Sequence, residues 1–200
     1  AGFDGCVRVD DSNQCTLSDV QADTTVTTRF APVTTFNGTT VPASGSGEPA
    51  SASFTGGGES CRFDTETAFI APPAAPPEGQ TLPQGMFHFK LIGCEPGSTV
   101  AMSVTWPRPV AGYVKYGPAA SGAQPGYFEP TALAIDGRTV TFPVQDGALG
   151  DDDGQANGEI TDPSGPTARV AFIPTLGAWG LLLLSLLAGV LGVLARARSV

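Results

Sequence analysis

An acidic run in the last third of the chain carries the residues best suited to bind a metal ion. Asp151, Asp153, Asn157 and Asp162 supply oxygen ligands at short spacing, and calcium takes about six to eight such oxygens. An EF-hand loop starting at Asp151 would need glycine where Ala156 stands and glutamate at position 162. The run predicts either a generic calcium loop or a solvated turn whose carboxylates accept backbone N–H groups, and we favour the turn.

The sole histidine is the next candidate for chemistry. His88 stands between Phe87 and Phe89, and in a strand it faces the opposite side from both. A catalytic histidine needs a nucleophile and an orienting acid. The chain has no Gly-x-Ser-x-Gly elbow to supply the nucleophile. We therefore predict a surface histidine, no catalytic residue and no enzyme activity.

Aromatic side chains offer a third kind of site, because exposed rings can stack on carbohydrate. The alternative is packing in a core, which we favour for Trp106 and Tyr113. Tyr127 and Phe128 lie in a loop rich in Pro and Gly and leave both alternatives open. The candidates for a glycan-binding surface are Trp106, Tyr113, Tyr116, Tyr127 and Phe128.

Short strands must position these residues. The chain has 26 Gly and 18 Pro, which disfavours long helices and favours strands joined by turns. The clearest strand is 85–94, and the turn at 95–98 leads to 99–106 as its antiparallel partner. Residues 113–118 form another strand, and 134–144 form a hairpin around Asp136-Gly137. This pattern predicts a mainly β fold, an antiparallel immunoglobulin-like β-sandwich.

Composition divides the chain into four parts. Residues 1–31 are predicted as a small β remnant and 59–170 as the sandwich. A Thr-, Ser- and Gly-rich linker is predicted between them at 32–58, with a small hairpin turn at Asn37-Gly38. The fourth part is the apolar tail at 173–200.

Four cysteines and the charge balance limit the class of protein. An even number of cysteines in a lean β-rich chain predicts two disulfides, and three pairings exist. We favour Cys6–Cys15 and Cys61–Cys94, because each pair lies within one compositional unit. The net charge is −9, and the tail holds two of the ten basic residues and no acid. An acidic chain repels phosphate backbones, so no nucleic-acid partner is expected.

The tail has the composition of a membrane span. Residues 176–195 are uncharged and Leu-rich, and at ~1.5 Å per residue a helix of this length crosses a hydrocarbon core of ~30 Å. Trp179 lies near its outer end, and Arg196 and Arg198 follow it directly. Because positive residues stay in the cytoplasm, residues 1–172 are expected outside it. The alternative is a buried core helix.

The start of this tail resembles the IPTL-CTERM sorting signal of Gram-negative bacteria. The resemblance implies recognition and cleavage by an exosortase-type transpeptidase, followed by release or re-anchoring at the cell surface. A plain anchor that is never cut is the alternative. The residues that carry the resemblance are Ile173, Pro174, Thr175, Leu176, Trp179 and Gly180, followed by the basic end.

Two further resemblances concern residues 1–31 and 60–167. Residues 60–167 resemble the choice-of-anchor U domain of bacterial surface proteins, through LPQGMF at 82–87, GCEPGSTV at 93–100, YGP at 116–118 and DGALGDDD at 146–153. That resemblance implies a surface location, no known catalysis and a Cys61–Cys94 bridge. Residues 1–31 resemble the end of an InlB B-type repeat, through GFDGC, CTL and DTTVTTRF, which implies further repeats upstream.

These observations predict an exported cell-surface protein of non-catalytic β modules, sorted through its tail and free of cofactors. One alternative is a calcium- or glycan-binding adhesion module. The other is the end of a larger secreted hydrolase whose catalytic residues precede Ala1.

Overall fold

The computed structural model describes residues 2–9, 14–29, 31–120, 123–169 and 185–186. The chain divides into two compact units, residues 1–168 and 169–200. Strands make up the first unit, and within the described residues the only helical positions are Ser185 and Leu186. The predicted mainly β, antiparallel fold is confirmed.

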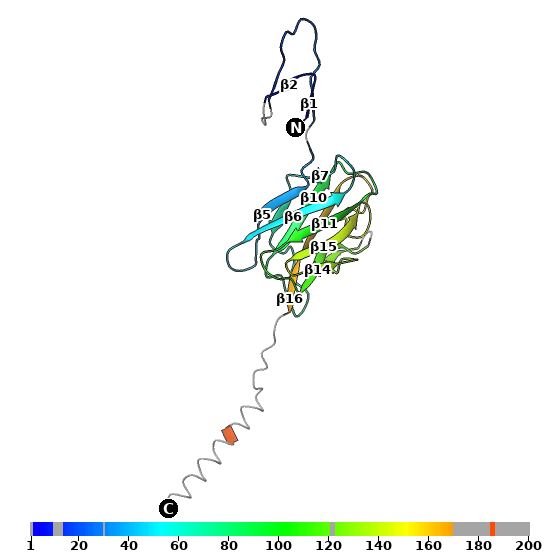
Figure 1. The fold of residues 1–200 in the computed structure, drawn as a ribbon. Helices are drawn as coiled ribbons and strands as arrows, with labels where there is room; N and C mark the ends of the chain where they lie inside the picture. Colours follow the sequence, from blue (N-terminus) through cyan, green and yellow to red (C-terminus); the bar gives the residue numbers. More distant parts are fainter. Residues whose placement is uncertain (1, 10–13, 30, 121–122, 170–184, 187–200) are drawn as a thin grey trace, which may run out of the picture. The chain divides into compact units, whose positions relative to one another are not determined.

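A five-stranded antiparallel sheet forms one layer of the first unit (Figure 1). Its centre is the three-strand run β6, β11 and β15, which pair along most of their length. Inward and outward residues alternate along these three strands, as a sheet with one buried face requires. In spatial order the strands are β14 (Ala134–Asp136), β15 (Thr139–Gln145), β11 (Thr99–Thr105), β6 (Pro49–Gly56) and β5 (Thr35–Thr39).

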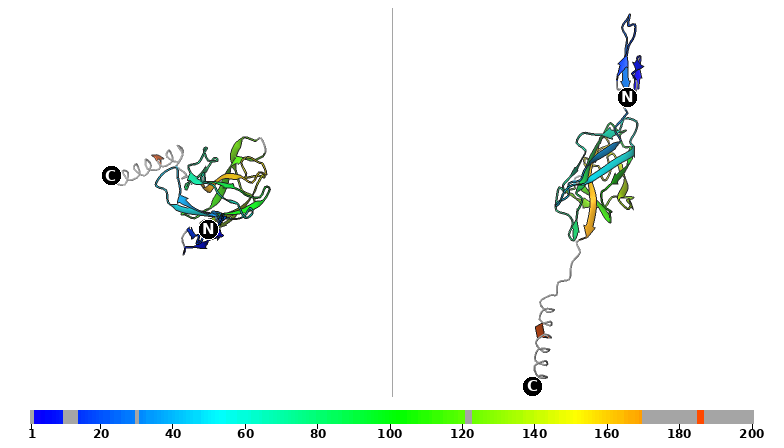
Figure 2. Two further views of the ribbon diagram at one scale, coloured as in Figure 1. Left: turned by 90° about the horizontal axis from the view of Figure 1, so that it is seen from above. Right: turned by 60° about the vertical axis from the view of Figure 1, so that its left-hand side comes forward.

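A seven-stranded sheet forms the other layer (Figure 2). Its main path is β13 (Pro125–Phe128), β12 (Gly112–Pro118), β16 (Ile160–Arg169), β10 (Met86–Ile92) and β7 (Arg62–Phe63). Two short strands join it from the side, β8 (Ala68–Ile70) on β10 and β9 (Gln80–Thr81) on β16. The long strand β16 is central, with β12 on one edge and β10 on the other.

The core lies between the two sheets. Phe87 and Phe89 of β10 are fully buried, as are Val100 and Met102 of β11. Their alternation with polar neighbours is the period-two pattern of strands with one apolar face. A smaller apolar cluster on the other side of β10 and β12 joins Leu82, Met86 and Val114, so part of that face is covered too.

In the amino-terminal segment, none of the described residues belongs to a buried apolar core. It consists of two separate two-stranded pairs, β1 (Gly2–Asp4) with β4 (Thr27–Arg29) and β2 (Val7–Arg8) with β3 (Cys15–Thr16). Val7 is 71% exposed, and Leu17 and Val20 are exposed as well. The Cys6–Cys15 disulfide closes the loop beside β2 and β3.

Three expectations about the β-rich part need correction. Residues 32–58 are no linker, because β5 and β6 lie there and β6 pairs with β11 along its length. Asn37-Gly38 is no turn, since both residues lie inside β5. β11 does not pair with β10: after the turn at 95–98 the chain crosses to the other sheet, where both strands bury their apolar faces against each other. The hairpin at 134–144 is confirmed as β14 and β15.

Candidate functional site

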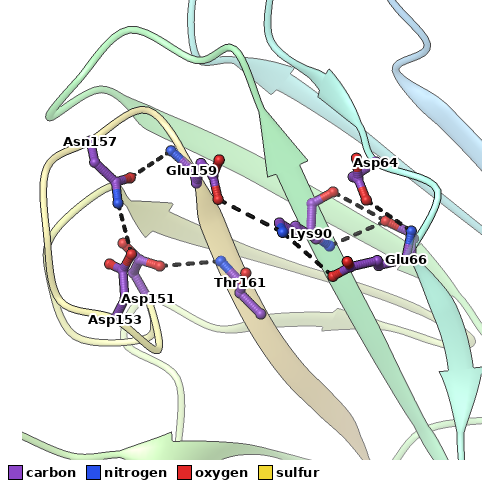
Figure 3. A network of polar contacts seen from close by, with 9 residues as sticks. Asp64, Glu66, Lys90, Asp151, Asp153, Asn157, Glu159 and Thr161 are labelled. Carbon is purple, nitrogen blue, oxygen red and sulfur yellow. Dashed lines mark hydrogen bonds and ion pairs between the residues drawn. The ribbon is translucent and has the colours of Figure 1, made fainter.

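The predicted acidic run forms the connection between β15 and β16, and its first carboxylate holds the loop closed (Figure 3). Asp151 is buried. Its Oδ2 accepts the backbone N–H of Gly147 at 2.9 Å, and its Oδ1 accepts that of Thr161 at 3.1 Å. Asp151 therefore ties both ends of the loop together, which is the turn that we favoured over a calcium loop.

The next two predicted ligands are also occupied within the loop. Asp153 accepts the backbone N–H of Gln155 and the side-chain N–H of Asn157, both at 2.8 Å. Asn157 in turn accepts the backbone N–H of Glu159 at 2.8 Å. Such side-chain to backbone bonds are the usual way in which Asp and Asn stabilise turns.

The fourth predicted ligand points elsewhere. Asp162 lies on β16 and faces the core, where its Oδ2 is 2.7 Å from Nζ of Lys115 on β12. Both side chains are buried, at 1% and 2% exposure respectively. Over the residues that the structure describes, no three His, Cys, Asp or Glu side chains are grouped to hold a metal ion. The structure thus brings Asp151, Asp153 and Asn157 into one loop but separates Asp162 from them, and calcium binding stays a prediction.

Asp146 is a structural residue that the sequence did not single out. It is buried, and its Oδ2 accepts the backbone N–H of Gly97 at 2.8 Å and of Gly158 at 2.9 Å. The carboxylate therefore links the start of the acidic loop to the turn between the two sheets. In the sequence it appears only as the first residue of DGALGDDD, with no role of its own.

Burial changes the protonation of this region. Desolvation raises the pKa of Asp151 to about 6. Desolvation, together with the charges of Asp162 and Asp151, raises the pKa of Asp152 to about 7. Desolvation also raises the pKa of Asp162 to about 6, against the opposing effect of Lys115. A small cleft of about 170 Å³ lies beside the loop, and Asp151, Asp152 and Pro118 are among the residues that line it.

His88 lies on the outer side of β10, between β8 and β16. It faces away from the core, opposite Phe87 and Phe89 as predicted, but it is half-buried, and burial lowers its pKa. Its neighbours in the adjacent strands are Ala68 and Pro163, and neither carries a hydroxyl, thiol or carboxyl group. The absence of a catalytic residue stays a prediction.

The aromatic candidates are used for packing. Trp106 and Tyr113 are buried in the main core, and the Tyr113 hydroxyl is 3.0 Å from that of Ser164. Tyr116 and Tyr127 are half-buried with their rings 4.9 Å apart, and the Tyr127 hydroxyl donates to the Ala74 carbonyl at 2.7 Å. Phe128 is half-buried too.

Both predicted disulfides are present. Cys6 is bonded to Cys15 and Cys61 to Cys94. Cys61 and Cys94 are buried in the main core, where their bridge connects the segment before β7 to the end of β10.

The predicted sorting tail lies almost entirely outside the described residues. This holds for the proposed helix at 176–195 and for the residues named for sorting and topology, which are Ile173, Pro174, Thr175, Leu176, Trp179, Gly180, Arg196 and Arg198. Within the described part of the chain, no helix has the length and apolar character that a bilayer crossing requires. The identity of the tail therefore follows from its similarity to known sequence motifs.

Residues 173–198 match the IPTL-CTERM motif. The match begins at Ile173 and includes the apolar run and both arginines, so it covers the features from which the sequence predicted a sorting signal. No curated protein and no solved structure matches the chain. The IPTL-CTERM motif is a carboxyl-terminal sorting signal of exosortase substrates, consistent with export and with membrane association through this end of the chain.

Proposed function

We propose that the chain is an exported surface protein whose β modules are not enzymes, and whose tail is recognised and cut by an exosortase-type transpeptidase. The observation that carries the proposal is the IPTL-CTERM match at 173–198. In this proposal residues 1–172 lie outside the cytoplasm, and the protein is released or re-anchored at the cell surface after cleavage. The bacterium is Gram-negative, as the resemblance implies.

The physical character of the tail supports this role. The run 176–195 is long enough to cross a bilayer as a helix, and Arg196 and Arg198 would hold its end in the cytoplasm. Pro174 disfavours helix at the residue before it, which would leave the motif extended and open to a protease. The tail would then be a temporary address, as the hydrophobic tail of a GPI signal is.

The internal contacts of the β-sandwich support a non-catalytic role. Asp146, Asp151 and Asp153 each accept hydrogen bonds that close the acidic loop. The two residues that pair in register with His88, Ala68 and Pro163, carry no nucleophilic group. Glycan binding through Trp106 or Tyr113 would require rings that are now in the core to become exposed. The proposed resemblances to a choice-of-anchor U domain and to an InlB B-type repeat agree with a surface module.

Expression in a host with and without the matching transpeptidase tests the proposal. The full chain carries an epitope after Val200, and the mature carboxyl terminus is read by mass spectrometry. With the enzyme, the protein should lose residues 181–200, and without it the epitope should remain. An intact carboxyl terminus on the surface of the enzyme-containing host would leave only a plain anchor.

Two variants test whether the enzyme recognises the motif itself. Replacing Pro174 by Ala changes the motif alone and should leave the tail uncut. The matched control is Ser185→Ala, which lies in the apolar run and should be cut like the unaltered chain. Equal cleavage of both variants would contradict recognition through the motif.

A further inference from the structure

Lys115 and Asp162 form a buried pair on two neighbouring strands. Lys115 of β12 pairs in register with Ser164 of β16, so Asp162 is its diagonal neighbour on the same face of the sheet. The Lys115 Nζ atom is 2.7 Å from Asp162 Oδ2, and each side chain is no more than 2% exposed. The amine and the carboxyl carbon are therefore held next to each other inside the core.

The surroundings of the pair are unusually poor in hydrogen-bond donors. Within the described residues no hydrogen bond is formed to either oxygen of Asp162, apart from the close approach of Lys115 itself. The Lys115 Nζ atom lies 4.9 Å from the centre of the Phe142 ring, and a side chain at Gly150 would collide with it. Two buried charges with so few partners are expensive, because desolvation offsets much of their attraction.

We propose that Lys115 and Asp162 are joined by an amide bond between Nζ and Cγ, formed within the folded domain with loss of one water molecule. This bond is independent of the proposed sorting function, so either proposal can fail without the other. The bond would replace two buried charges by one neutral amide. It would also fasten β16, the strand that ends at Arg169 just before the IPTL-CTERM motif, to its neighbour β12.

The reaction is a balanced condensation. A proton first passes from the Lys115 ammonium to the Asp162 carboxylate, which leaves a neutral amine and a carboxylic acid. The nitrogen lone pair then attacks Cγ and the N–C bond forms. The C–OH bond breaks, and the departing hydroxyl takes one proton from nitrogen and leaves as water. Burial favours the first step, since desolvation raises the pKa of Asp162. Holding the two groups in contact supplies the large effective concentration that an uncatalysed amide formation lacks.

Asp152 is placed to carry protons in this reaction. A side chain at Gly117 would collide with Asp152 Oδ1, so the carboxylate occupies the space beside β12 two residues beyond Lys115. Residues two apart on a strand share a face and lie about 7 Å apart. The Asp152 charge interacts with those of Asp162 and Lys115, and its pKa of about 7 lets it donate and accept a proton near neutrality. Asp152 also lines the cleft beside the loop, which gives the released water a route to solvent.

Intact mass spectrometry of the full chain tests the bond. The chain is purified in detergent, reduced to open both disulfides, denatured and weighed. The expected mass is lower than that of the sequence by one water. A mass equal to that of the sequence overturns the proposal. Digestion with trypsin should then yield one branched peptide containing both residues, with no cleavage after Lys115. Cleavage after Lys115, or loss of water at another position, also overturns it.

Variants identify the reacting groups and provide a matched control. Asp162→Asn should lose ammonia in place of water, and Lys115→Arg should keep the full mass. Lys90→Arg alters the exposed pair of Lys90 with Glu66 and should still lose one water. Chain collected unfolded from inclusion bodies, before the bond can form, is refolded and weighed over time. Asp152→Asn should slow its loss of water by at least tenfold, at unchanged fold by circular dichroism. An unchanged rate would remove Asp152 from the reaction and leave the bond itself supported by the mass.

Discussion

The two faces of the seven-stranded sheet each carry a lysine–carboxylate pair, and the two pairs differ in distance and in exposure to solvent. Lys115 and Asp162 meet on the inner face at 2.7 Å and are almost fully buried. On the outer face, Lys90 lies 3.4 Å from Glu66 and 3.8 Å from Glu159, and the Glu66 side chain is 65% exposed (Figure 3). The same chemical groups therefore occupy an apolar environment in one pair and a solvated one in the other.

The comparison shows that the surroundings of a charged pair decide how much it contributes to stability, more than the pairing itself does. An exposed pair gains little, because water and salt screen its attraction. A buried pair is costly to form and more costly to break, because removing one partner leaves an uncompensated charge in the core. The same confinement brings an amine and a carboxyl group into reactive contact, which solvent would prevent on the outer face.

The largest effect is expected from breaking the inner pair. Asp162→Ala prevents the proposed amide bond and leaves the Lys115 ammonium buried without a partner, so we expect the free energy of unfolding to fall by about 3–5 kcal/mol or more. Urea unfolding followed by Trp fluorescence measures this change. Glu66→Ala breaks the outer pair in the same sheet and should leave the free energy of unfolding unchanged within error. Equal losses of unfolding free energy in the two variants would show that burial does not make the inner pair more important than the outer one.

The two disulfides extend the comparison to regions with and without a core. Replacing Cys61 and Cys94 by Ala opens a loop of 33 residues and should destabilise the sandwich by about 3–4 kcal/mol. Replacing Cys6 and Cys15 should leave the unfolding of the sandwich unchanged, because that bridge lies in the amino-terminal segment. Thermal unfolding followed by near-ultraviolet circular dichroism distinguishes the two. A lower melting temperature for the sandwich in the second variant would contradict this separation.

Strand alternation and cysteine spacing predicted much of this architecture from the sequence. The alternating apolar run in β10 and the Asp136-Gly137 turn were both identified correctly. The strand β6 was missed because its inward positions are Ala50, Ala52 and Phe54 among Ser and Thr, a composition typical of linkers. Small inward residues are tolerated there because β6 pairs with β11 and packs beneath large rings. Local composition does not contain that information.

The site was predicted less well, for a related reason. Asp162 was grouped with Asp151 and Asp153 by proximity in the sequence, but the start of β16 turns it toward the core. Its partner Lys115 lies 47 positions earlier in the chain, on a strand whose alternation puts it on the same face as buried Tyr113. A lysine at an inward position is the one signal that could have indicated the pair. The sequence does not show which residue pairs with this lysine, because that is set by which strands become neighbours in the sheet.

An intermediate effect is expected from the carboxylate that joins the loop to the opposite sheet. Asp146→Ala removes the acceptor of the Gly97 and Gly158 N–H groups, which should cost about 1–3 kcal/mol in a buried setting. Asp153→Ala removes an acceptor on the exposed side of the same loop and should cost under about 0.5 kcal/mol. Urea unfolding of the two variants measures the difference. If Asp153→Ala lost more stability than Asp146→Ala, the exposed side of the loop would contribute more to stability than the buried side.

The last effect is a dependence of stability on pH, to which the buried carboxylates and His88 contribute with opposite signs. The pKa values of Asp151, Asp152 and Asp162 lie above that of an unfolded aspartate, at about 6, 7 and 6. Between about pH 4 and pH 7 the folded chain therefore holds protons that the unfolded chain releases, and lowering the pH favours the folded state. His88 acts the other way below about pH 6.5, because its pKa is lowered by burial and the unfolded chain then binds the extra proton.

Urea unfolding of His88→Gln at pH 8 and pH 5 isolates the carboxylates. Stability should increase on acidification, by more than about 1 kcal/mol even after allowance for the partial exposure of Asp152. Adding Asp152→Asn should reduce the increase, since that group has the highest of the three pKa values. An amide bond between Lys115 and Asp162 removes Asp162 from titration, so the linked chain should show a smaller increase than Lys115→Arg. A profile that is flat in His88→Gln would mean that the buried carboxylates keep ordinary pKa values. In that case the inner and outer faces of the sheet would differ in packing but not in protonation.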